Sequence, residues 1–183
     1  MTFDEKNAEL RGKLFTPEEQ IQMYRLKAKA YHTNIIIPLD YTSKLDWVIT
    51  GDVFVSLLHN TTIQDLDVFV LNVDSTTVSL FDKEPHYEKK ESSGYNNNSS
   101  ILAVYNEKNS NQQIIMTTYK TRKELLEDFD FIHCMISYHR DNLYITRQMY
   151  DAIMHKKLIP NKPKEDIRSY RINKYLERGF TWE

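Results

Sequence analysis

The chain has 183 residues, of which 40% are hydrophobic and 27% are charged. This balance is typical of a water-soluble globular protein and excludes a disordered chain. No apolar run approaches the roughly 18 residues of a membrane span, and no secretory signal follows Met1, so we expect a cytoplasmic protein without membrane contact. The single cysteine excludes an internal disulfide and a CxxC motif, and the four glycines form no Gly-rich phosphate loop.

The formal net charge of −2 hides an uneven distribution along the chain. Residues 32–146 contain 9 Lys/Arg and 16 Asp/Glu, a net charge of −7, whereas residues 147–183 contain 9 and 5, a net charge of +4. An acidic middle suits cations, and a basic tail suits a polyanion. The alternative for the tail is a helical face that simply contacts solvent.

The first predicted elements are a helix and a compact strand–helix–strand unit. Thr16-Pro17-Glu18-Glu19 is a capping box with proline at the first helical position, and it predicts an amphipathic helix over residues 16–32. Residues 45–50 read as a short buried strand that stops at Gly51. A short helix over 52–59 and a strand over 64–71 follow.

Short strands and helices continue to the C-terminus. The pattern predicts strands over 76–81, 101–105, 113–118, 129–138 and 143–145, with a polar surface loop over 82–100 and a turn at 139–142. It predicts helices that begin at Thr121, run over 146–158 and run over 165–178 up to Gly179. We therefore expect a single α+β domain over 1–183: a core over 45–145, the helix over 16–32, and basic helices over 146–183.

The most informative element is Asp65-Leu66-Asp67. Residues i and i+2 of a strand share a face, so the two carboxylates lie side by side while Leu66 points into the core. Adjacent carboxylates repel each other, and a divalent cation such as Mg²⁺ relieves that repulsion. Alone, the pattern is weak, because exposed acidic pairs are common. The turn at Gly51 strengthens it, since a helix N-terminus beside two carboxylates suits a metal-bound phosphate.

The motif resembles that of the DNA polymerase β-like nucleotidyltransferases, of the tRNA nucleotidyltransferase and poly(A) polymerase head-domain type. Their hallmark is hydrophobic-Gly-[Gly/Ser] followed, after about ten residues, by Asp-hydrophobic-[Asp/Glu]-hydrophobic. Here it reads Ile49-Thr50-Gly51-Asp52 and Asp65-Leu66-Asp67-Val68, and the resemblance covers residues 45–145. It implies a nucleotidyltransferase-like mixed sheet, catalysis and metal binding by Asp65 and Asp67, and Mg²⁺ or Mn²⁺ as the cofactor.

The resemblance also implies how a nucleoside triphosphate (NTP) is held. Thr50, Gly51 and Ser56 are the expected phosphate contacts. Asp52 departs from the family, which has Gly or Ser there: its carboxylate either faces inward and repels a phosphate, or caps the helix. The family often has a third carboxylate on a later strand. Asp130 is the best match for this metal ligand and proton acceptor, with Asp128 as the fallback and solvent contact as the alternative.

Two further groups are predicted from spacing. Arg171, Lys174 and Arg178 share one face of the last helix and are placed to contact a nucleotide or an RNA backbone, unless that face is only solvated. His133 and Cys134 are neighbours on a predicted strand, so they point to opposite faces and cannot bind one metal together. Cys134 reads as a small buried hydrophobe.

The sequence predicts a metal-dependent nucleotidyltransferase that moves an NMP group from an NTP to an RNA, protein or small-molecule hydroxyl. A different reading is a catalytically reduced nucleotide-binding module that acts as an antitoxin-like or inhibitory partner, which Asp52 favours. In a third, the acidic motif is incidental in an unrelated α+β fold. The sequence leaves the oligomeric state open.

Overall fold

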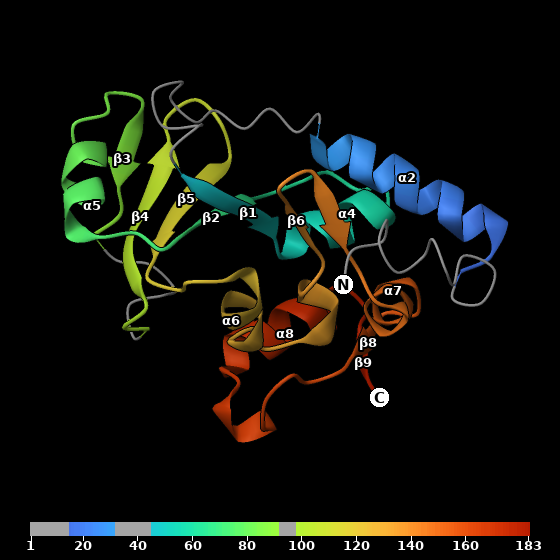
Figure 1. The fold of residues 1–183 in the computed structure, drawn as a ribbon. Coiled ribbons are helices and arrows are strands. Elements are labelled where there is room, and N and C mark those ends of the chain that lie inside the picture. Colours follow the sequence, from blue (N-terminus) through green and yellow to red (C-terminus); the bar gives the residue numbers. More distant parts are fainter. Residues whose placement is uncertain (1–14, 32–44, 92–97) are drawn as a thin grey trace.

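The computed structural model describes residues 15–31, 45–91 and 98–183 and contains a seven-stranded mixed sheet flanked by helices (Figure 1). Across the sheet the strands are β3 (Tyr87–Lys89), β4 (Ile101–Glu107), β5 (Gln112–Thr117), β2 (Leu66–Leu71), β1 (Asp46–Thr50), β6 (Ser137–His139) and β7 (Asn142–Tyr144). The strand pair β2–β5 is parallel and the other neighbours are antiparallel. The α+β prediction is confirmed.

Six helices, two 3₁₀ turns and a two-stranded sheet accompany the main sheet in the described ranges. They are α2 (Pro17–Tyr31), α4 (Asp52–Leu58), α5 (Ser75–Phe81), α6 (Arg122–Glu127), α7 (Arg147–Met154) and α8 (Ser169–Glu177), the 3₁₀ turns η1 (Ile132–Cys134) and η2 (Lys164–Asp166), and the strands β8 (Lys157–Leu158) and β9 (Thr181–Trp182). The capping box of α2 is present: the Glu19 N–H donates to Thr16 Oγ1 at 3.2 Å, and the Thr16 N–H donates to Glu19 Oε2 at 2.8 Å. Met23 and Leu26 form the buried face of this helix.

The alternation of β2 gives the sheet two differently packed faces. Val68 and Val70 belong to the main buried cluster, which also contains Phe54 of α4 and Tyr175 of α8. Phe69 and Leu71 point to the other face and pack in a smaller cluster with Leu125 of α6. Asp67 has the parity of Phe69, so it lies on the face that α6 covers only in part. This is the face on which a pocket opens.

The predicted strand over 76–81 is wrong, because this segment is the helix α5. Threonine and valine favour a strand locally, but the Asp74 carboxylate caps the segment as a helix by accepting the Thr77 N–H at 2.8 Å. The helix is anchored by Phe81, which packs against Tyr87 and Tyr105 at 4.8 Å between ring centroids. Tertiary packing and a cap here outweigh β-propensity.

The predicted strand over 129–138 is also mostly wrong. The segment contains the 3₁₀ turn η1, and only Ser137–His139 pairs in the sheet as β6. The break is held by β1: the Gly51 N–H donates to the Cys134 carbonyl at 3.2 Å, and the Thr50 hydroxyl donates to the Ile136 carbonyl at 2.8 Å. Asp130 therefore lies in a bend before η1 rather than on a strand.

The C-terminal elements are shorter than predicted. The helix expected over 146–158 ends at Met154 and gives way to β8, and the helix expected over 165–178 is divided into η2 and α8. Gly179 stops α8 with a φ of 83°, as predicted. The loop expected over 82–100 contains the strand β3, and its residues 92–97 lie outside the described part of the chain. The turn between β6 and β7 is present, with positive φ at Arg140 and Asp141.

In the described ranges, none of the helices combines the length and apolar character needed to cross a bilayer.

Candidate active site

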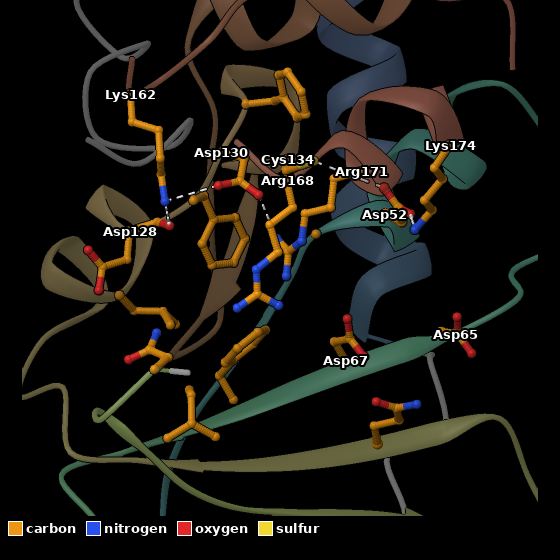
Figure 2. Close-up of a pocket in the computed structure, with 18 of the residues that line it drawn as sticks. Asp52, Asp65, Asp67, Asp128, Asp130, Cys134, Lys162, Arg168, Arg171 and Lys174 are labelled. Atoms are coloured by element: carbon orange, nitrogen blue, oxygen red, sulfur yellow. Dashed lines mark hydrogen bonds and ion pairs between the residues drawn. The ribbon is translucent and has the colours of Figure 1, made fainter. Parts of the chain in front are cut away.

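A pocket of about 620 Å³ opens between the Asp67 face of the sheet and α8 (Figure 2). Its sheet side carries the acidic residues Asp65 and Asp67, and Arg171 and Lys174 of α8 line the opposite side. Aromatic and aliphatic side chains, among them Phe69, line the space between them. The acidic middle and the basic tail of the sequence therefore meet across one cavity.

Asp65 and Asp67 lie together at the start of β2, as the alternation predicts (Figure 2). Within the described residues, neither carboxylate has a hydrogen bond or an ion pair. Burial raises the pKa of Asp67 to about 7, with further contributions from the negative charges of Asp65 and Asp52. The pair is short of positive charge, and oxygen ligands of this kind suit Mg²⁺ or Mn²⁺.

Gly51 forms the tight turn between β1 and α4. Its φ of 90° favours glycine, and a Cβ built at this position would lie 4.0 Å from Asp67 Oδ2. The predicted turn therefore lies directly beside the Asp67 carboxylate. Its own N–H is already used, because it donates to the Cys134 carbonyl.

Asp52 takes the first of the two positions predicted for it, because its side chain faces inward and lines the pocket. Its side chain does not cap α4, whose N-cap is Gly51. It pairs instead with α8: the carboxylate accepts from the Tyr175 hydroxyl, contacts Lys174 Nζ, and lies 3.2 Å from the Arg178 guanidinium. Burial works to raise the pKa of Asp52, but Lys174, Tyr175 and Arg178 outweigh it, and the pKa is lowered. The negative charge of Asp52 is therefore compensated by Lys174 and Arg178.

Asp130 is also paired, at a different place in the pocket. Lys162 Nζ lies 3.0 Å from its Oδ1, and the Arg171 guanidinium donates to its Oδ2 at 2.9 Å. Figure 2 shows the side chains of Arg168 and Arg171 reaching into the space between Asp130 and Asp67. The structure therefore brings Asp65 and Asp67 together and places Asp130 apart from them.

The predicted basic face of the last helix points into the pocket. Arg171 and Lys174 line the cavity and hold Asp130 and Asp52, and Arg178 adds a second cation to Asp52. These residues are not simply solvated, because each forms an ion pair with a carboxylate from a distant part of the sequence. Tyr175 is buried, whereas Tyr170 is 51% exposed at the rim.

Thr50 and Ser56, predicted to contact phosphates, lie outside the pocket lining. Thr50 is fully buried, and its hydroxyl donates to the carbonyls of Cys134 at 3.1 Å and Ile136 at 2.8 Å. Ser56 is buried on α4, where its carbonyl accepts the Thr61 N–H at 2.9 Å. Thr50 therefore holds the backbone next to the Gly51 turn, whereas Ser56 contacts the segment that follows α4.

The prediction that His133 and Cys134 point to opposite faces is wrong. Both lie in the 3₁₀ turn η1 rather than on a strand, and a ligand atom from each lies within 4.8 Å of the Asp52 carboxylate and of the other. Burial lowers the pKa of His133 to about 4 and raises the pKa of the Cys134 thiol. The buried environment predicted for Cys134 is confirmed.

Sequence comparison places the chain among known proteins. The profile described as Gad2, Gabija anti-defense 2 family protein, matches residues 18–156, which is more than half of the chain. The chain belongs to the Gabija anti-defense 2 family. No curated protein matches its sequence.

Solved structures show the fold to which this family member is similar. A CCA-adding enzyme in an apo form matches at a TM-score of 0.57 and 13% identity, covering 100% of this chain and 43% of the enzyme. The Bacillus stearothermophilus CCA-adding enzyme in complex with CTP matches at 0.56 and 14%, covering 92% and 42%. The Thermotoga maritima CCA-adding enzyme in complex with tRNA matches at 0.55 and 14%, covering 100% and 42%.

At these identities the similarity establishes a nucleotidyltransferase-like fold for this member of the Gabija anti-defense 2 family. The chain spans less than half the length of the enzymes it matches. The mixed sheet expected from the Asp-x-Asp motif is therefore confirmed as a fold.

Several pocket residues were not predicted from the sequence. Lys90 follows β3, Lys162 lies between β8 and η2, and Arg168 precedes α8; all three line the pocket. The charge of the basic tail was the only signal for Lys162 and Arg168. Tyr119 and Asp128 form a polar end of the pocket, where the Tyr119 hydroxyl donates to the Asp128 carboxylate. Asp128 was considered only as a substitute for Asp130.

Proposed function

We propose that this protein is a metal-dependent nucleotidyltransferase that binds an NTP between β2 and α8 and transfers its nucleotidyl group to an acceptor hydroxyl. The observation that carries the proposal is the position of Asp65 and Asp67, two carboxylates without ion-pair partners among the described residues. They face the basic wall of α8, formed by Arg171 and Lys174, across one pocket. The nucleotidyltransferase-like fold supports it, and so does the sequence motif, in which Asp65 and Asp67 are the two acids of Asp-x-Asp.

The donor atoms fit a hard divalent cation. Asp65 and Asp67 offer carboxylate oxygens on one side of β2, and burial together with the charges of Asp65 and Asp52 raises the pKa of Asp67 to about 7 despite the opposing charges of Lys174 and Lys90. Bound there, Mg²⁺ or Mn²⁺ would supply Lewis-acid activation of the acceptor and charge neutralisation of the triphosphate. Asp67 gives up its proton when the cation binds, so binding of NTP and metal strengthens as the pH rises through 7.

The basic residues of α8 bind and orient the phosphates. Arg171 and Lys174 lie opposite the carboxylate pair, and Lys90, which follows the edge strand β3, also lines the cavity. Guanidinium and ammonium groups form charge-assisted hydrogen bonds to phosphate oxygens. Asp130 is a positioning residue in this account, because it holds the Arg171 guanidinium at 2.9 Å.

The family name suggests the setting for this chemistry. We infer that the pocket serves to oppose Gabija defense, with an RNA, protein or small-molecule hydroxyl as the acceptor. Neighbours with the same fold are recorded in complex with CTP and with tRNA, which supports a nucleotide and an RNA as candidate partners.

A second candidate is a nucleotide-binding module that acts without turnover. The pairing of Asp52 with Lys174 and Arg178 favours it, because this carboxylate competes with a triphosphate for the same cations. Such a module would oppose defense by sequestering a nucleotide or by docking on a protein with the nucleotide bound.

The experiment measures transfer of label from each of the four NTPs, labelled on the α-phosphate, into total cellular RNA and protein. Reactions contain the full chain with Mg²⁺ or Mn²⁺. We expect label to enter one acceptor class from a preferred NTP. The variant Asp65→Asn/Asp67→Asn removes the carboxylate pair and should abolish transfer. Glu88→Gln, an exposed acid on β3 outside the pocket, is the matched control and should retain it.

Two outcomes separate the candidates. Metal-dependent NTP binding without transfer of label overturns the catalytic proposal and supports the binding module. Equal transfer by the wild type and the double variant shows that a contaminating enzyme is responsible, and removes the site assignment.

A further inference from the structure

A second group of metal-ligating side chains lies beside the carboxylate pair but shares no residue with it. A carboxylate oxygen of Asp52, a ring nitrogen of His133 and Sγ of Cys134 all lie within 4.8 Å of one another. The three residues come from two elements, the start of α4 and the turn η1, that β1 holds together through the Gly51–Cys134 and Thr50–Ile136 hydrogen bonds. The spacing is therefore fixed by the backbone core.

His133 is the independent sign that this group binds something. Its side chain is fully buried, yet in the described part of the structure neither ring nitrogen has a hydrogen-bond partner. The ring lies among Phe131, Tyr175 and Phe180, with centroids 5.5, 4.4 and 4.8 Å away. Buried polar atoms are nearly always paired, and an exception calls for an explanation such as a missing ion. A bound metal would satisfy one of these nitrogens.

The two carboxylate oxygens of Asp52 have different neighbours. Its Oδ2 contacts Lys174 and Arg178, which neutralise the carboxylate from the side of the helix. Its Oδ1 faces the other way, 4.0 Å from Cys134 Sγ, and accepts from the Tyr175 hydroxyl. The Tyr175 oxygen also lies 3.0 Å from Cys134 Sγ. The ion pairs with Lys174 and Arg178 therefore leave Oδ1 beside the Cys134 thiol and the Tyr175 hydroxyl.

The group is reachable from solvent through the pocket. Asp52, Cys134 and Tyr175 all line the cavity, whereas His133 is fully buried and does not line it. Two of the three ligand residues are therefore in contact with the pocket. The open side of such a site faces the space assigned to the nucleotide.

We propose that Asp52, His133 and Cys134 form a binding site for Zn²⁺, separate from the Mg²⁺ site on Asp65 and Asp67. One sulfur, one nitrogen and one oxygen ligand are the mixed set that Zn²⁺ accepts, with a fourth position left for Tyr175, water or a ligand in the pocket. A thiol and an imidazole are poor ligands for Mg²⁺, and two carboxylates without sulfur are hard ligands, so the two sites select different metals.

Binding changes the protonation of one residue. The Cys134 thiol loses its proton to solvent as the sulfur–metal bond forms, whereas His133 binds as the neutral imidazole and Asp52 as the carboxylate. Thiolate and carboxylate together offset the two charges of Zn²⁺. Lys174 and Arg178 then add positive charge to the pocket, which strengthens its attraction for an anionic ligand.

The test uses Co²⁺ as an optical substitute for Zn²⁺. The chain contains a single cysteine, so a near-ultraviolet thiolate-to-cobalt absorption band reports Cys134 alone. The full chain is freed of metal with a chelator and titrated with Co²⁺. We expect this band to saturate at one equivalent, visible bands of a tetrahedral ion to appear with it, and Zn²⁺ to displace both.

Variants separate ligation from folding. Cys134→Ser should lose the charge-transfer band, and His133→Phe, which keeps an aromatic ring in the same packing, should weaken Zn²⁺ binding by at least about tenfold. Circular dichroism confirms that each variant is folded. Asp65→Asn/Asp67→Asn should keep the band, because the site does not depend on the proposed nucleotidyl transfer.

Three results would overturn the proposal. They are a folded wild-type chain without the band, a band of unchanged strength and affinity in folded His133→Phe, or loss of the band in the Asp65→Asn/Asp67→Asn variant. The last result would mean that cation binding at Cys134 requires the carboxylate pair, so that the two sites are not separate.

Discussion

Asp52 and Asp67 line the same pocket, but their environments are opposite. Asp52 has Lys174, Arg178 and the Tyr175 hydroxyl around it, and its pKa is lowered. Asp67 has burial and two other carboxylates around it, and its pKa is raised to about 7. Both residues are aspartates, so residue type does not explain why one carboxylate has ion-pair partners and the other has none among the described residues. The cations of α8 decide it, because they form ion pairs with Asp52, whereas Lys174 acts on Asp67 only through its charge at a greater distance.

The largest effect on activity is expected from neutralising Asp67, which has no ion-pair partner among the described residues. Asp67→Asn should lower nucleotidyl transfer by at least about 100-fold, because an amide oxygen is a weaker metal ligand than a carboxylate. It should not destabilise the fold, since it removes a half-buried charge that has no ion-pair partner among the described residues. The checks are the labelled-NTP assay and the urea midpoint. A large loss of stability would show that Asp67 is a structural residue.

Neutralising the paired acid should have the reverse effect. Asp52→Asn leaves Lys174 and Arg178 without their counter-charge and should cost about 2–4 kcal/mol of unfolding free energy, measured by urea denaturation. The matched control is Glu127→Gln, which removes an exposed i,i+4 pair with Lys123 and should change stability by about 0.5 kcal/mol or less. Equal effects of the two variants would mean that the α8 contact contributes little.

The pH dependence of the unfolding free energy should reveal the raised pKa of Asp67. The raised pKa of Asp67 means that the folded state binds more protons than the unfolded state between about pH 4 and 7, so this residue lowers stability as the pH rises through that range. His133 has a lowered pKa of about 4 and acts in the opposite direction over part of the same range. The informative quantity is therefore the difference between wild type and Asp67→Asn.

We expect that difference to favour Asp67→Asn by about 1–3 kcal/mol at pH 8 and to vanish near pH 4. Urea unfolding in metal-free buffer at several pH values measures it. A difference that is constant with pH would show that Asp67 titrates normally.

The smallest effect is expected on the basic wall. Lys174→Ala should weaken NTP binding by about tenfold and reduce its dependence on salt, because one ammonium contact to the phosphates is lost. Fluorescence titration with a labelled NTP at several salt concentrations measures both quantities. Lys123→Ala, an exposed lysine on α6 outside the pocket, should change neither. Unchanged affinity in Lys174→Ala would limit this residue to its ion pair with Asp52.

Local signals predicted much of the fold. The capping boxes at Thr16 and Thr121 and the alternation through Asp67 each depend on residues within one element, and each is present in the structure. The strand expected over 76–81 failed because the Asp74 cap and the burial of Phe81 prevailed over β-propensity. The strand expected over 129–138 failed because hydrogen bonds from Thr50 and Gly51 fix a turn there.

Some features of the candidate site can likewise be predicted from local sequence, and others depend on contacts between distant segments. The adjacency of Asp65 and Asp67 and the closeness of Gly51 follow from strand geometry and a tight turn, so the sequence predicts them. The convergence of Asp52, His133 and Cys134 depends on η1, and the pairing of Asp130 depends on Lys162 and Arg171. Cys134 lies 82 residues from Asp52 and Arg171 lies 41 residues from Asp130, and no periodicity brings such partners together.

By itself the sequence determined the α+β class, the acidic pair on β2 and the basic face of the last helix, because each is a pattern within one element. Only the tertiary structure decided that α8 lies against the pocket, where its cations satisfy Asp52 and Asp130 and leave Asp65 and Asp67 unpaired. The physical reason is range. Helix and strand periodicity act over a few residues, whereas ion pairs depend on which distant segments the packed core brings within a few ångströms.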